Sequence, residues 1–194
     1  MAYKTILLNE SAYIKASAAK RKLSEKLRRK LSFSDLINEV FGKRIEFLDI
    51  DNELRAYIES FSERLRQTDC VLGLLLFGSV AKGRSYNKYS DIDLLVVVRD
   101  KKDIWGTMER IHKIKGELAQ QSKELAAKQL PMFISPIVID EKELNAFRPI
   151  YLDFLDYGIV LFEKQNVLTD FLNEMRKIKH SRSFRPYEVL TWKI

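Results

Sequence analysis

Residues 74–98 read LLLFGSVAKGRSYNKYSDIDLLVVV, and this stretch decides the fold of the 194-residue chain. Two apolar runs of strand length enclose a polar segment, which opens with Gly78-Ser79 and closes with Asp91-Ile92-Asp93. Apolar runs bounded in this way predict a strand, a tight turn, a polar loop and a second strand. The rest of the chain is expected to pack around these two strands.

Each polar residue at these strand ends has a chemical use. Gly78 lacks a Cβ, so backbone or a phosphate can approach it closely. Ser79 offers a hydroxyl and an amide at the start of the next turn, where a helix N-terminus would favour an anion. Asp91 and Asp93 lie two apart on a strand and share a face, where their carboxylates repel each other unless a cation lies between them. Mg²⁺ suits this place, because it accepts one or two carboxylates together with water and substrate phosphates.

The glycine–serine turn, the two acids and the eleven residues between Ser79 and Asp91 resemble the nucleotidyltransferase signature of the DNA polymerase beta superfamily. The similarity is closest to minimal nucleotidyltransferases, in which a GSxAxG turn precedes SDIDLLV. Here residues 78–83 are GSVAKG and residues 90–96 are SDIDLLV. The resemblance implies an α+β fold, with a palm-like mixed sheet flanked by helices. The alternative is an ordinary β–α–β corner whose acids only solvate a strand end.

The resemblance also implies a role for each of these residues. Asp91 and Asp93 would be the catalytic acids and would hold Mg²⁺. Gly78 and Ser79 would bind the β- and γ-phosphates of an NTP, with ATP as the leading candidate.

Two cations follow Ser79 on the turn and loop, Lys82 and Arg84. They are expected to neutralise phosphate charge, and solvated loop charges are the alternative. A hydroxyl acceptor would attack the α-phosphorus in line, and pyrophosphate would leave. The family resemblance makes a protein such as a HEPN-domain toxin a candidate acceptor, with this chain as its antitoxin. Two other functions stay open: a DNA-binding or interaction regulator with a degenerate NTP site, and a small-molecule nucleotidyltransferase, which would need an acceptor domain.

A third carboxylate is expected on the next strand in active members of the superfamily, where it ligates metal and accepts the proton of the attacking hydroxyl. The corresponding stretch, residues 133–138, reads FISPIV, which places Ser135 where the acid is expected. Asp140 or Glu141 could reach over from the end of this strand, or Asp140 could only cap the helix that follows. Pro136 predicts that the strand lies at an edge of the sheet or carries a bulge.

The composition limits the class of protein. A hydrophobic content of 46% supports a real core, and a formal net charge of +7 favours an anionic partner such as a nucleotide or nucleic acid. The one cysteine, Cys70, cannot form a disulfide within the chain. Because no signal peptide and no apolar run of about 18 residues is present, a cytoplasmic protein without a membrane partner is expected.

The first 50 residues predict a separate strand–helix–helix segment, with the strand at 4–8, a first helix that begins at Glu10 and a second helix over 33–41. The stretches TILLNESAY and SFSDLINEVFGKR resemble ribbon-helix-helix antitoxins of the VapB type. That resemblance implies a homodimer whose paired strands bind DNA, with further phosphate contacts from the basic residues at 20–30. The alternative is a helical hairpin that packs on the catalytic domain with a solvated basic face.

The predicted domains are 1–50 for the N-terminal segment and linker, 51–180 for the nucleotidyltransferase domain and 181–194 for a basic, aromatic tail. Apolar periodicity and caps predict the remaining elements of the middle domain. These are helices at about 52–66, 103–128, 141–156 and 167–179, and strands at 132–139 and 157–162.

Overall fold

A computed structural model of the chain describes residues 13, 17–18, 20–21, 24–25, 45, 48–83 and 86–181, except for the side chains of 178–181. The chain divides into two compact units, Met1–Lys43 and Arg44–Ile194. In the first unit, the described residues between Tyr13 and Glu25 are helical, as the sequence predicted. The predicted strand at 4–8, the second helix at 33–41 and the tail beyond 181 lie outside the described residues. The ribbon-helix-helix segment, its dimer and its DNA contacts therefore stay predictions.

The second unit carries the nucleotidyltransferase signature. Its elements alternate between strands and helices along the chain. In order they are α3 (Asn52–Arg66), β1 (Val71–Phe77), α4 (Gly78–Ala81), β2 (Ile92–Val98), α5 (Asp103–Glu117), α6 (Ala119–Ala127), β3 (Ile134–Asp140), the 3-10 helix η2 (Glu141–Asn145), α7 (Tyr151–Tyr157), β4 (Ile159–Glu163) and α8 (Val167–Ser181).

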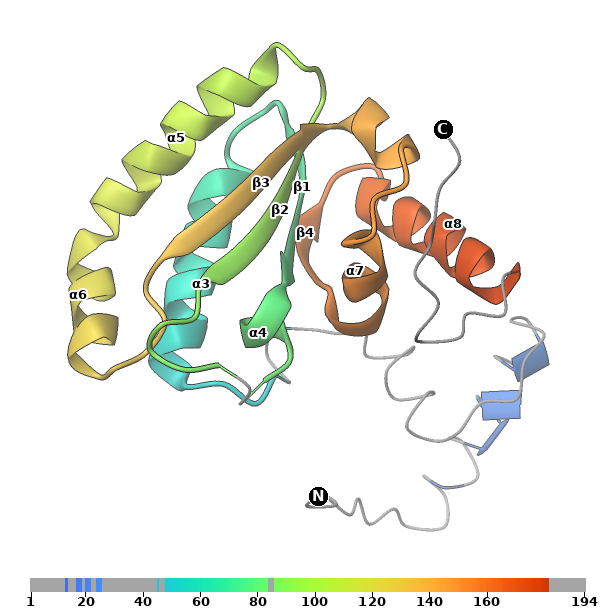
Figure 1. The fold of residues 1–194 in the computed structure, drawn as a ribbon, viewed down its shortest axis with the longest axis horizontal. Helices are drawn as coiled ribbons and strands as arrows, with labels where there is room; N and C mark the ends of the chain where they lie inside the picture. Colours follow the sequence, from blue (N-terminus) through green and yellow to red (C-terminus); the bar gives the residue numbers. More distant parts are fainter. Residues whose placement is uncertain are drawn as a thin grey trace. The chain divides into compact units, whose positions relative to one another are not determined.

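The four strands form one mixed sheet in the order β3-β2-β1-β4 (Figure 1). Strand β1 pairs antiparallel with both β2 and β4, whereas β2 and β3 are parallel. Parallel neighbours require a long crossover, which α5 and α6 supply. Strand β3 is terminal in this order, so the edge position predicted from Pro136 is confirmed. The predicted α+β fold, a mixed sheet flanked by helices, is confirmed as well.

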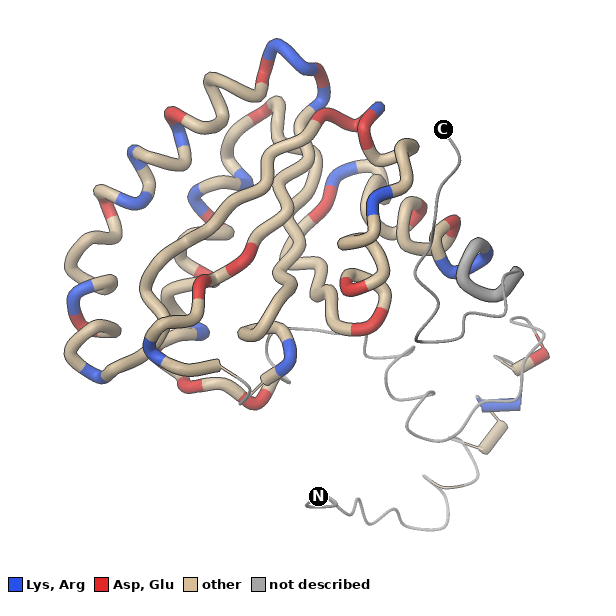
Figure 2. Tube along the Cα trace, viewed as in Figure 1, with Lys and Arg blue, Asp and Glu red and all other residues tan. Residues whose placement is uncertain are grey.

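Alternating side chains of the strands pack into two apolar cores, one on each face of the sheet. Leu74 and Leu76 of β1 pack into the core that α3, α5 and α6 cover. Leu75 and Phe77 point the other way, into the core that η2, α7 and α8 cover. The helices therefore flank the sheet in two outer layers, seen to either side of the strands in Figure 1. Charged residues lie mainly on these helices and on the loops, and the strands carry few (Figure 2).

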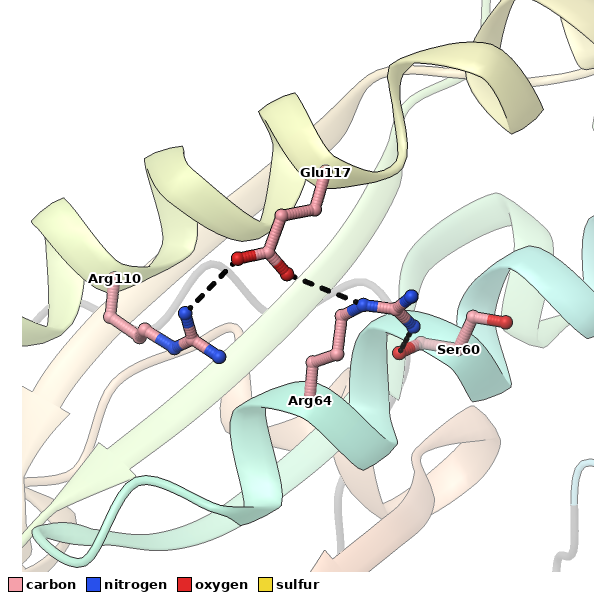
Figure 3. Close-up of polar contacts among 4 residues, drawn as sticks. All are labelled: Ser60, Arg64, Arg110 and Glu117. Carbon is pink, nitrogen blue, oxygen red and sulfur yellow. Dashed lines mark hydrogen bonds and ion pairs between the residues drawn. The ribbon is translucent and has the colours of Figure 1, made fainter.

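Ion pairs of Glu117 link α5 to α3 (Figure 3). Glu117 of α5 accepts from Arg110 through Oε1 at 3.3 Å and pairs through Oε2 with Nε of Arg64 on α3 at 3.4 Å. Arg64 also donates from Nη1 to the carbonyl of Ser60 at 3.1 Å. Because all three charged side chains are partly exposed, each pair contributes on the order of 1 kcal/mol or less. The arrangement orients α5 more than it stabilises the fold.

Two of the predicted helices differ from those observed. The predicted helix over 103–128 is two helices, because the chain departs from helical ψ at Leu118, two residues after the flexible Gly116. The predicted helix over 141–156 is the 3-10 helix η2 followed by α7. Pro149 lies between them, and a proline disfavours helical backbone in the residue before it. The helices at 52–66 and 167–181 agree with their predicted positions to within two residues.

Candidate nucleotide-binding site

Gly78 and Asp93 meet where β1 ends. Gly78 directly follows β1, and the last residue of that strand, Phe77, pairs with Asp93 in the ladder. The φ angle of Gly78 is +71°, a conformation that side-chain-bearing residues rarely adopt. A Cβ at this position would overlap an oxygen of the Asp93 carboxylate. The glycine therefore lets the turn close directly against the acid.

Asp91 and Asp93 form the acidic pair that the sequence predicted. Asp93 leaves β2 on the face opposite to its neighbours Ile92 and Leu94, which are buried in the core beneath α3 and α5. Asp93 is half-buried, whereas Asp91 is exposed. Burial raises the pKa of the Asp93 carboxyl, and the nearby Asp91 carboxylate raises it further. The two carboxylate charges therefore repel each other, and a bound cation would reduce this repulsion.

These residues fit a Mg²⁺ ion. Among the described residues there is no group of three or more His, Cys, Asp or Glu side chains arranged for a metal. Mg²⁺ does not require such a group, because one or two carboxylates, water and substrate phosphates suffice. The paired acids, with Asp93 packed directly against the Gly78 backbone, provide the carboxylates of that combination.

The register of β2 and β3 places Ser135 and Asp140 at different distances from Asp93. Ser135 is the direct ladder partner of Asp93, at the position where the sequence placed the missing acid. Asp140 pairs with Val98, five residues farther along β2, which is roughly 16 Å away. Its Oδ1 accepts from the backbone N–H of Glu143 at 3.0 Å, as a helix cap does. Asp140 is therefore a cap and lies at the far end of the strand pair.

Lys82 makes contacts that the sequence gave no sign of. Its Nζ lies 3.4 Å from Oδ2 of Asp153 and 4.7 Å from the ring centroid of Tyr157, both on α7. These partners lie more than 70 residues away in the sequence, and no motif marks them. Lys82 is thus held toward α7, at the end of the short helix α4, which Gly78 and Ser79 begin.

The loop between α4 and β2 is anchored at both ends of its described part. Gly83 has a φ angle of +74° and lies against the backbone of Asp49. The hydroxyl of Tyr86 donates to Oδ2 of Asp51 at 2.6 Å and accepts from its backbone N–H at 3.1 Å. Arg84, predicted to neutralise phosphate charge, lies outside the described residues.

Comparison with known proteins gives a family. The model of the nucleotidyltransferase domain matches residues 54–178. A search of curated proteins found no match. No helix of the described segments is both long and apolar enough to cross a membrane.

Several solved toxin–antitoxin complexes match more distantly. One contains AMP-PNP and matches at a TM-score of 0.35 and 17% identity, over 68% of this chain and 93% of that chain. Another is the tri-AMPylated Shewanella oneidensis HEPN toxin with its MNT antitoxin, at a TM-score of 0.36 and 16% identity, over 64% and 87%. A third, MntA-HepT, gives 0.33 and 14%, over 66% and 92%. TM-scores this low support no conclusion about this chain, so its assignment rests on the family match and the site.

The matched range covers well over half of the chain and contains Gly78, both acids and Ser135. The chain belongs to the nucleotidyltransferase domain family.

Proposed function

We propose that this protein transfers a nucleoside monophosphate from a Mg²⁺-bound NTP, with ATP as the leading candidate, to a hydroxyl acceptor. The observation that carries the proposal is the contact between Gly78 and Asp93, because it brings a turn free of side chain against an acid pair. A triphosphate needs both parts, a close backbone approach and a cation site beside it.

Each residue then has one role. Asp91 and Asp93 would hold Mg²⁺, which supplies positive charge to the phosphates when bound. The backbone at Gly78 and Ser79 would bind the β- and γ-phosphates, since the first amides of a helix have no partner within it and α4 has no side-chain cap. Lys82 would add charge at the end of α4, and Arg84 on the loop beyond it.

The reaction is an in-line displacement. The acceptor oxygen forms a bond to the α-phosphorus, the bond from that phosphorus to the oxygen bridging to the β-phosphate breaks, and pyrophosphate leaves. The proton of the acceptor hydroxyl passes to water, because Ser135 occupies the position beside Asp93 and a serine hydroxyl is a poor base. Loss of a positioned base typically costs 10²- to 10⁴-fold in rate. Slow turnover follows, with positioning and charge neutralisation retained.

A protein acceptor, a HEPN-type toxin with this chain as its antitoxin, is the specific form of the proposal. Its support is the resemblance of residues 78–96 to minimal nucleotidyltransferases. A cytoplasmic location and a homodimer belong to the same proposal.

Calorimetry of Mg²⁺ and ATP tests the site directly. The double variant Asp91→Asn plus Asp93→Asn should lose Mg²⁺-dependent binding and keep its fold, because removing two mutually repelling carboxylates relieves the native state. Asp140→Asn is the matched control: it makes the same chemical change at the far end of the strand pair, and asparagine still caps a helix. Equal binding by the double variant and the control would refute the assigned site.

A second function is favoured by Ser135, which stands where an acid is expected. The protein could bind Mg²⁺ and NTP as a regulator or interaction module without transfer. Incubation of the full chain with labelled ATP, Mg²⁺ and a HEPN-type protein separates the two. Label on the acceptor supports the transferase, whereas binding without label supports the regulator.

A further inference from the structure

Phe133 is an exposed aromatic residue beside the acid pair. It precedes β3, and 58% of the residue's surface is exposed to solvent. Its carbonyl accepts from the backbone N–H of Ile92 at 2.8 Å, so Phe133 lies at the start of the parallel ladder, one residue before the pair of Ile92 and Ile134. Its neighbour Ile134 is buried in the core beneath α3 and α5, which places the Phe133 side chain on the opposite face of the strand. That is the face of Asp93 and Ser135.

The backbone beneath this ring is fixed. Besides the bond to Ile92, the carbonyl of the preceding Met132 accepts from the hydroxyl of Tyr57 on α3 at 3.5 Å. Pro131 is buried. A single exposed apolar side chain is ordinary on a protein surface. A large one on an anchored strand end, one strand spacing of roughly 4.8 Å from an acid pair, is suited to contact a ligand at low entropic cost.

The strand order, taken with the proposed function, indicates which part of the reaction would lie beside Phe133. In the order β3-β2-β1, the acids on β2 lie between the Gly78 turn at the end of β1 and Phe133 at the start of β3. The proposed function places the leaving pyrophosphate at the Gly78 turn. In-line displacement requires the attacking oxygen on the opposite side of the α-phosphorus, which is the β3 side. The group beside Phe133 is therefore the acceptor, not the departing phosphates.

We propose that Phe133 is the acceptor-contacting residue of this site, and that the acceptor carries an apolar group beside its reacting hydroxyl. This inference rests on the proposed function. It assigns specificity for the acceptor to a residue that plays no part in holding the triphosphate. Acceptor binding and nucleotide binding are then separable by substitution, although their sites lie one strand apart.

The test measures binding of a small probe alcohol to the full chain without turnover. The protein is saturated with Mg²⁺ and α,β-methylene ATP, which cannot transfer its nucleotide, and 2-phenylethanol is titrated by saturation-transfer difference NMR. Calorimetry of the ATP analogue is run on the same samples. Ethylene glycol, which has hydroxyls and no apolar group, is the comparison probe.

The wild type should bind 2-phenylethanol more tightly than ethylene glycol. Phe133→Ala should weaken 2-phenylethanol roughly tenfold, the size of one lost aromatic contact, and leave the affinity for the ATP analogue unchanged. Phe133→Trp should retain the probe. Trp105→Ala is the matched control, because Trp105 is also an exposed aromatic but lies on α5, which follows the opposite end of β2.

Three results would overturn the inference: no 2-phenylethanol binding by a wild type that binds the analogue, undiminished binding by Phe133→Ala, or a loss of analogue affinity in Phe133→Ala. The last would assign Phe133 to the nucleoside. Failure of the wild type to bind the analogue would refute the proposed function itself, and this inference with it.

Discussion

Replacement of Gly78 by alanine tests the core of the site. Two separate penalties follow from the structure. At a φ angle of +71°, a residue with a Cβ costs roughly 1–2 kcal/mol. The new Cβ also overlaps the Asp93 carboxylate, which must leave its rotamer at a cost of about 1 kcal/mol. The free energy of unfolding should therefore fall by about 2–3 kcal/mol.

Gly78→Ala should also weaken Mg²⁺-dependent ATP binding, because the displaced Asp93 carboxylate is a proposed metal ligand. A shift of about 1 Å in a positioned group can cost on the order of 10²-fold. Mg²⁺-dependent ATP binding, measured by calorimetry, should weaken by roughly ten- to a hundredfold. Urea unfolding of the same samples gives the stability change.

Gly83→Ala is the control for the backbone penalty. Gly83 has nearly the same φ angle, +74°, but its added Cβ would meet the Asp49 carbonyl at 3.5 Å, an ordinary contact. It should lose about 1–2 kcal/mol and bind Mg²⁺ and ATP within a few-fold of the wild type. If the two variants lose equal stability and bind equally, Gly78 serves only the turn, and the reasoning from its contact with Asp93 is wrong.

Ser135→Asp should raise nucleotide transfer by up to roughly 10²- to 10⁴-fold in a labelled-ATP assay, because it restores a base beside Asp93; an unchanged rate would show that the base is not what limits turnover. Asp140→Ala should cost about 1 kcal/mol in urea unfolding through loss of its cap and leave transfer unchanged, whereas loss of transfer at full stability would contradict its assignment as a cap. Burial raises the pKa of Tyr57, so the free energy of unfolding should fall as the pH rises above about 10, where the unfolded tyrosine ionises first. The free energy of unfolding of Tyr57→Phe should fall less steeply over that range, and identical slopes would show that Tyr57 does not cause this pH dependence. Deletion of residues 1–44 should convert a dimer to a monomer in sedimentation, and a full-length monomer at micromolar concentration would exclude the ribbon.

The strands and the acid pair could be predicted from sequence because their signals are local. Two continuous apolar runs and the short segment between Gly78 and Asp93 determine which strand ends meet, and the ladder pairs Phe77 with Asp93 accordingly. The edge position of β3 followed from Pro136 for a similar reason, since a proline cannot donate to a ladder. These features need no information from distant parts of the chain.

Contacts between distant segments could not be predicted in this way. The pairing of Lys82 with Asp153 depends on how α7 packs against α4, and no spacing encodes it. The role of Asp140 was ambiguous until the ladder register placed it opposite Val98 rather than near Asp93. The helix breaks at Leu118 and Pro149 were missed because apolar periodicity continues across both.

Parallel pairing of β2 with β3 also determines how the site assembles during folding. The strands β1 and β2 are neighbours in sequence, so the turn at Gly78 and the acids come together through local contacts. Ser135 and Phe133 reach them only after the chain of α5 and α6 has closed a long loop, and such non-local pairings form slowly. Substitutions in these two helices can therefore change how fast the acceptor side of the site forms.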